Sequence, residues 1–124
     1  MTIDQAQLQQ WCEKWQKILR LRDWDVKIQL ARGFKLTDKQ GDVEWSKSQK
    51  TAAIRILEPV DYSPDLLTPQ DAEQCVVHEL LHLHFAPVDK FEGVEDMLLE
   101  QAIDSIAWAL VKCDRAGAAL PLAA

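Results

Sequence analysis

The chain has 124 residues, of which 48% are hydrophobic and 27% charged, enough for one domain that buries roughly two-thirds of its unfolded surface without disulfides or a structural metal. Its 20 acidic and 14 basic side chains give a formal net charge of −6 and no basic stripe, so we expect no nucleic-acid partner. The three cysteines are widely spaced, and no segment resembles a secretion signal or a membrane span, which predicts a cytoplasmic protein without a membrane partner.

The N-terminal region carries apolar residues at spacings of three and four, the pattern of an amphipathic helix with one buried face. We expect this helix between Asp4 and Arg20. Its predicted buried positions are Leu8, Trp11, Trp15, Ile18 and Leu19. The period then changes to two in "DWDVKIQLARG", residues 23–33, which predicts a half-buried strand.

Two further short strands follow this first one. They are predicted around "DVEWS", residues 42–46, and in "TAAIRIL", residues 51–57. The intervening "KSQK" is a turn-like segment between two strand-like runs, so we expect the two strands to form a hairpin.

Two helices complete the predicted elements. The first is expected to begin in "TPQD", with Thr68 as the N-cap and Pro69 at the first helical position, and to end near Phe85. The second is a long helix from about Phe91 to Cys113. The order α-β-β-β-α-α predicts an α+β domain with a small, mainly antiparallel three-stranded sheet.

We expect this domain to cover residues 1–115, followed by a short apolar tail over residues 116–124. The tail, "AGAALPLAA", consists of small and apolar residues and contains Pro121. Its simplest interpretation is a frayed terminus.

All three histidines of the chain lie in "CVVHELLHLHF", residues 75–85. On a helix each residue turns by about 100°, so His78 and His82 lie about 40° apart on one face, as two imidazoles that share a metal must. Glu79 lies beside this pair, and the Val and Leu positions fall on the core side. His84 lies about 200° from His82, and we therefore interpret it as a packing or helix-end residue.

A third ligand is needed, because a catalytic zinc takes three protein ligands and keeps one position open for water. The chain has no further histidine and no suitably placed cysteine, which leaves a carboxylate. Glu100 and Asp104 are i,i+4 neighbours in the last helix, with Asp96 one turn earlier. The alternatives are an ordinary solvated acidic face and two histidines whose hydrogen bonds are satisfied within the core.

At these residues the chain resembles the gluzincin metallopeptidases, in which H-E-x-x-H on one helix is followed, about twenty residues later, by Glu and then by Asp four positions further on. The resemblance implies that His78, His82 and Glu100 bind Zn²⁺, that Asp104 holds the ring of His78, and that Glu79 is the catalytic general base and acid. It implies hydrolysis of peptide or protein substrates, by an endopeptidase rather than an exopeptidase.

The length and the element order are similar to those of the minigluzincins, single-domain peptidases with an N-terminal helix, a three-stranded sheet, an active-site helix and a glutamate helix. The resemblance implies a zincin-like fold, with "TAAIRIL" as the strand at the cleft edge. It also gives the C-terminal tail a second interpretation, as a segment that blocks the cleft in a zymogen or mediates self-association.

Two residues have open roles. Larger gluzincins stabilise the oxyanion with a His or Tyr beyond the glutamate helix, and no such residue follows Glu100. Tyr62, the only tyrosine, is a candidate for that role or for packing a loop. Cys75, three residues before His78, is a candidate for the pocket that accepts the residue after the cleaved bond; the alternatives are a fourth zinc ligand and a small buried hydrophobe.

Other functions remain open beside general proteolysis. One is a protease that cuts a single cognate protein. Another is a zinc-binding regulatory or interaction module with one cognate partner and little or no general proteolysis. The last alternative is a structural protein without a metal.

Overall fold

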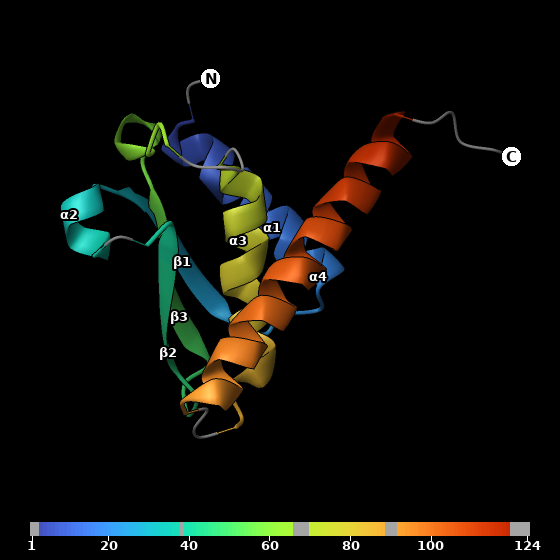
Figure 1. The fold of residues 1–124 in the computed structure, drawn as a ribbon. Coiled ribbons are helices and arrows are strands. Elements are labelled where there is room, and N and C mark those ends of the chain that lie inside the picture. Colours follow the sequence, from blue (N-terminus) through green and yellow to red (C-terminus); the bar gives the residue numbers. More distant parts are fainter. Residues whose placement is uncertain (1–2, 38, 66–69, 89–91, 120–124) are drawn as a thin grey trace, which may run out of the picture.

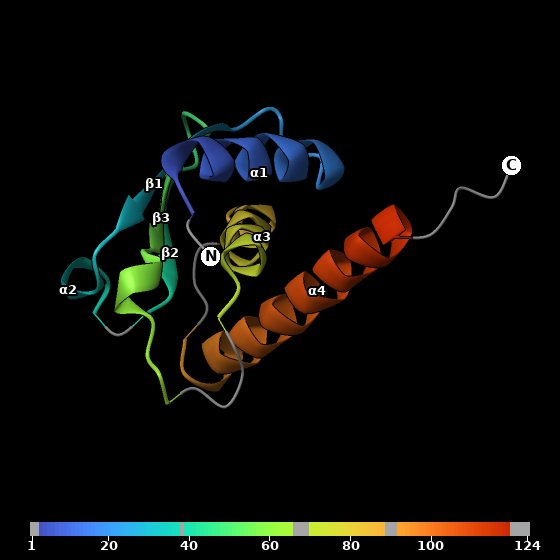
Figure 2. The ribbon, with the colours of Figure 1, turned by 90° about the horizontal axis from the view of Figure 1, so that it is seen from above.

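A three-stranded sheet carries helices α1 (Gln5–Ile18) and α3 (Ala72–His82) on one face, and helix α4 (Val94–Ala119) packs on α3 (Figures 1 and 2). The computed structural model of the chain describes residues 3–37, 39–65, 70–88 and 92–119. The predicted α+β class is confirmed. None of the helices in the described ranges combines the length and the apolar composition that a membrane span requires.

Helix α1 begins after Asp4, whose side chain caps it by accepting a hydrogen bond from the Gln7 N–H (2.9 Å). The residues that it buries completely are Leu8, Cys12 and Trp15. The prediction that Ile18 is buried is wrong, because its side chain is 48% exposed. The buried stripe is centred on Leu8 and Cys12, and Ile18 lies about 80° from Leu8 around the helix.

The sheet contains β1 (Asp25–Ala31), β2 (Gly41–Ser46) and β3 (Thr51–Leu57), in the order β1-β3-β2. Strands β2 and β3 form the predicted antiparallel hairpin. Strands β1 and β3 pair in parallel, from Asp25↔Thr51 to Ala31↔Leu57. The mainly antiparallel prediction is therefore wrong, since one of the two strand pairs is parallel and the sheet is mixed.

The position of β3 corrects a second prediction. The short helix α2 (Gly33–Leu36) connects β1 to β2, which lies at the far edge, and β3 then enters between the two. Because β3 is hydrogen-bonded on both sides, "TAAIRIL" cannot be the edge of a cleft. The edge strand beside α3 is β2.

Helix α3 begins three residues later than predicted. Its N-cap is Asp71, whose side chain accepts from the Gln74 N–H (3.1 Å); the predicted cap Thr68 and Pro69 lie outside the described residues. The α-helix ends at His82 and continues as a 3₁₀ turn, η2, over Leu83–Phe85, so its predicted end near Phe85 is confirmed.

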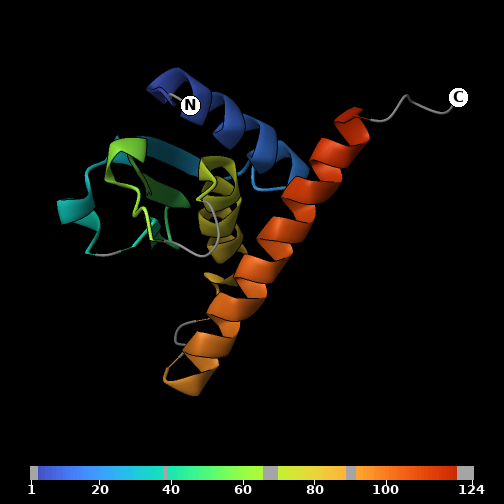
Figure 3. The same cartoon turned by 45° about the horizontal axis from the view of Figure 1, so that its top comes forward.

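Helix α4 is longer than predicted. It continues past Cys113 to Ala119, so residues 116–119 of the predicted tail are helical; its predicted start, Phe91, lies outside the described residues. The Ala-rich sequence explains the extension, because the single Gly117 costs a helix only about 1 kcal/mol. The C-terminal part of α4 extends away from the sheet (Figure 3).

A polar network centred on the buried Glu73 connects α1, α3 and α4. Glu73 on α3 is only 5% exposed, and its carboxylate accepts hydrogen bonds from Trp15 Nε1 (2.8 Å), Lys14 Nζ (2.9 Å) and Arg115 Nη2 (3.2 Å). We call these four residues the anchor network. Two cations and one indole N–H compensate the buried carboxylate, so this network holds the N-terminal half of α3 between its two neighbours.

Candidate metal centre

The two faces of α3 have opposite character. Val76, Val77 and Leu80 are completely buried, whereas the side chains of His78 and His82 keep 16% and 15% exposure. The apolar face packs into the core against the sheet, and the two imidazoles lie one helical turn apart with ring centroids separated by 5.3 Å. The helical spacing inferred from the sequence therefore places both histidines on one face.

Glu100 of α4 contacts both histidines. Its Oε2 lies 3.0 Å from His78 Nε2, and its Oε1 lies 2.8 Å from His82 Nε2. Two imidazoles of α3 thus contact the two oxygens of one α4 carboxylate.

Asp104 lies on the other side of the His78 ring. Its Oδ1 is 3.1 Å from His78 Nδ1 and also accepts a hydrogen bond from Gln74 Nε2 (2.8 Å). An Nδ1–H that donates to Asp104 leaves the lone pair on Nε2, the atom that faces Glu100. The sequence interpretation missed Gln74, which is only 3% exposed; the available signal was its position one turn before His78.

Glu79 is buried beside the histidines, with 7% exposure. A carboxylate oxygen of Glu79 and one ring nitrogen each of His78 and His82 all lie within 4.8 Å of one another. This group can bind a metal ion. Burial raises the pKa of Glu79 to about 7, and the nearby charge of Glu100 also raises it.

The backbone of β2 leaves no room for a side chain at position 41, chiefly because of the adjacent strand β3, and Glu79 lies on the same side. A Cβ there would lie 2.9 Å from the Arg55 carbonyl oxygen and 3.3 Å from Glu79 Oε2. The edge strand therefore runs directly past the buried carboxylate.

The surroundings of His82 favour its neutral form. Burial lowers its pKa, although the charge of Glu100 opposes the shift. A lowered pKa favours the neutral imidazole, the form that binds metals.

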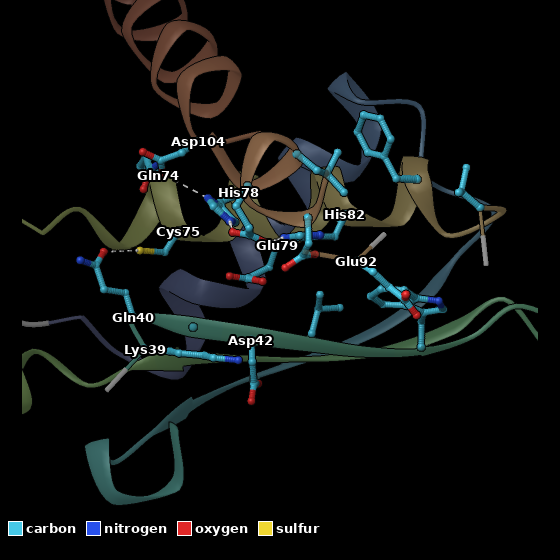
Figure 4. A pocket seen from close by; sticks show the side chains of 18 residues that line it. Lys39, Gln40, Asp42, Gln74, Cys75, His78, Glu79, His82, Glu92 and Asp104 are labelled. Atoms are coloured by element: carbon cyan, nitrogen blue, oxygen red, sulfur yellow. Dashed lines mark hydrogen bonds and ion pairs between the residues drawn. The ribbon is translucent and has the colours of Figure 1, made fainter. Parts of the chain in front are cut away.

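A cavity of about 850 Å³ opens between α3, α4 and β2 (Figure 4). His78, Glu79, His82, Glu100 and Asp104, which we call the histidine cluster, all line this cavity. All five are site residues predicted from the sequence, and the fold brings them together.

Within the described residues, the remaining predicted residues form no hydrogen bond or ion pair with the two histidines of the cluster, and each has its own surroundings. Cys75 lines the cavity and its Sγ donates to Gln40 Oε1 (3.5 Å); burial raises its pKa to about 12, so the thiol stays protonated. Tyr62 packs against the small apolar cluster that contains Leu36 and Leu57, away from the cavity. The ring of His84 is hydrogen-bonded to the Leu19 carbonyl oxygen (2.7 Å) at the end of α1, as expected of a helix-end residue.

No protein-family model matches the chain, and no curated protein or solved structure matches it. The function must therefore be argued from the geometry of the site.

Proposed function

We propose that the protein is a zinc-dependent metallopeptidase in which His78, His82 and Glu100 bind the metal and Glu79 is the general base. The observation that carries the proposal is the contact of both Nε2 atoms with one carboxylate. Two nitrogen or oxygen ligands held at 2.0–2.1 Å in tetrahedral geometry lie about 3.3 Å apart. The observed separations of 2.8 and 3.0 Å are only slightly smaller, so a small outward movement would admit the ion.

The donor set favours zinc over other common ions. Two imidazoles and one carboxylate form a set that suits a catalytic zinc site with one open position. Calcium and magnesium prefer sites made wholly of oxygen. Zinc, when bound, would supply Lewis acidity and lower the pKa of a water molecule toward about 7.

Glu79 is suited to move the proton of that water. A carboxylate with a pKa of about 7 can accept a proton near neutral pH and release it again. In peptide hydrolysis its oxygen would take the proton from the attacking water and deliver it to the amine nitrogen that leaves. Asp104 and Gln74 would hold the His78 ring throughout.

Strand β2 offers a place for an extended substrate. Leu57 N–H donates to the Gln40 carbonyl directly opposite (2.9 Å), so antiparallel alternation leaves the N–H and C=O groups of Gly41, Val43 and Trp45 directed to the open edge. An extended peptide can add to such an edge as another strand. Gly41 then brings its backbone next to Glu79.

Substitution of the general base tests the proposal. In Glu79→Gln the amide cannot accept the proton, so peptide cleavage should fall by about 10²–10⁴-fold while zinc binding persists. Glu44→Gln, an exposed change on the same edge strand, is the matched control and should cleave like the wild type. Cleavage by Glu79→Gln at the wild-type rate would refute the mechanism.

The same variant separates the proposed enzyme from a binding module. A zinc-binding interaction module would keep both zinc and its partner in Glu79→Gln, and its wild type would cleave no peptide. The zymogen role of the tail remains a prediction, because residues 120–124 lie outside the described residues.

A further inference from the structure

The cavity has two chemically different ends. Which residues lie at each end follows from the chain directions of β2, α3 and α4, the elements that line the cavity. Strand β2 and helix α3 run the same way, because Gln40 contacts Cys75 (3.5 Å) and Gly41 adjoins Glu79. Helix α4 runs the opposite way, since its Asp104 contacts Gln74 and its Glu100 reaches His82. Later residues of β2 and α3, and earlier residues of α4, therefore gather at one end.

The end at Cys75 is polar. It is lined by Gln40, Gln74, Cys75 and the cationic Lys39. The two carboxylates that also line the cavity here already have partners, since Asp42 accepts from Arg55 and Asp104 contacts Gln74 and His78. Figure 4 shows Gln40, Gln74 and Cys75 grouped on one side of the cavity, opposite His82.

The end beyond His82 is apolar with an acidic side chain beside it. Its apolar lining residues are Val43, Trp45, Phe85, Val88 and Leu99. Trp45 and Val88 are 41% and 50% exposed, so a bound side chain would remove apolar surface from water. Asp96 lines the same end, one helical turn before Glu100.

The direction in which a peptide binds decides which part of its sequence lies at each end of the cavity. Antiparallel pairing is slightly more stable per residue than parallel pairing. A peptide antiparallel to β2 places its N-terminal part beside Trp45 and its C-terminal part beside Gln40.

We infer that the site takes an extended peptide with a large apolar side chain and a basic neighbour on the N-terminal side of the cleaved bond, and an acidic or polar residue on its C-terminal side. The apolar side chain covers Trp45 and Val88, the basic neighbour faces Asp96, and the C-terminal side faces Lys39. This inference rests on the proposed peptidase function and names its substrate class.

A pair of peptides with identical composition and reversed order tests the inference. Acetylated and amidated Lys-Leu-Phe-Ala-Ser-Glu is compared with Glu-Ser-Ala-Phe-Leu-Lys, by cleavage with the zinc-loaded wild type and by affinity for zinc-loaded Glu79→Gln. We expect at least a tenfold preference for the first peptide, or about 1.4 kcal/mol. Equal affinity, a preference for the reversed peptide, or binding of neither peptide would overturn the inference.

The binding arm separates this inference from the proposed function. If Glu79→Gln prefers the first peptide and the wild type cleaves neither, the hydrolytic function fails and the peptide preference stands. Cleavage of both peptides at the same rate, with equal affinities, leaves the hydrolytic function intact and refutes the preference.

Variants at the two ends of the cavity identify the residues that cause the peptide preference. Val88→Ser should reduce the preference severalfold, whereas Val60→Ser, 74% exposed and outside the cavity, should not. Lys39→Gln should weaken binding of the first peptide, with Lys35→Gln as the control outside the cavity. An unchanged preference in both Val88→Ser and Lys39→Gln would contradict the assignment.

Discussion

The anchor network and the histidine cluster both join α3 to α4 through carboxylates, but they balance charge differently. In the anchor network, Glu73 is paired with two permanent cations, Lys14 and Arg115, which also pair with Asp114 and Asp71. In the histidine cluster, three carboxylates surround two imidazoles, and within the described residues no Lys or Arg forms an ion pair with them. Each carboxylate of the first region therefore has a permanent cation beside it, whereas the second region could accommodate an added cation.

This difference predicts that the two regions fail in different ways. Removing a member of the anchor network should lower the free energy of unfolding and leave metal affinity almost unchanged. Removing one of the proposed metal ligands, His78, His82 or Glu100, should lower metal affinity and leave the free energy of unfolding of the metal-free protein almost unchanged.

The largest effect on stability is expected from Glu73→Ala. It leaves the buried Trp15 Nε1 without its acceptor and separates α1 from α3, at a cost of about 3 kcal/mol in urea unfolding. Glu13→Ala, an exposed change on α1, is the control. A similar loss in both variants would mean that the network does not stabilise the fold.

The histidine cluster should make the stability of the metal-free protein depend on pH. The folded pKa of Glu79 is about 7 against an ordinary 4.5, so between these values the folded state binds more protons than the unfolded state. Through Glu79 alone, stability should therefore fall as pH rises from 4.5 to 7, by up to about 3 kcal/mol, whereas the lowered pKa of His82 acts in the opposite sense near its ordinary value of 6.5.

This pH dependence is measured by unfolding in the presence of a chelator. Glu79→Gln carries no titrating group at this position and should lose most of the slope. Parallel slopes in the wild type and the variant would show that Glu79 is ionised with an ordinary pKa.

A smaller effect is expected from Asp104→Asn. The amide holds the His78 ring less firmly, so zinc affinity should fall by about 10–100-fold, while the change in stability stays small because Asp104 is half-exposed. Competition with a zinc chelator measures the affinity. An unchanged affinity would show that Asp104 does not orient His78.

The sequence allowed the site to be predicted better than the sheet, for a physical reason. In a helix, the spacing of two residues along the sequence determines which face each side chain lies on. The shared face of His78 and His82, and that of Glu100 and Asp104, could therefore be predicted. The parallel pairing of β1 with β3 joins segments 26 residues apart, as in Asp25↔Thr51, and no local pattern specifies it. Gln74 was missed because an uncharged side chain gains its role only through the long-range contact with Asp104.

The proposed function requires that the histidine cluster bind one zinc ion. Elemental analysis of the purified wild type beside His82→Ala measures this zinc, with Glu73→Ala as a comparison from the anchor network. We expect about one zinc per chain in the wild type and in Glu73→Ala and almost none in His82→Ala, because loss of one of three ligands removes most of the affinity. Wild-type protein without zinc, or equal zinc in His82→Ala, would contradict it.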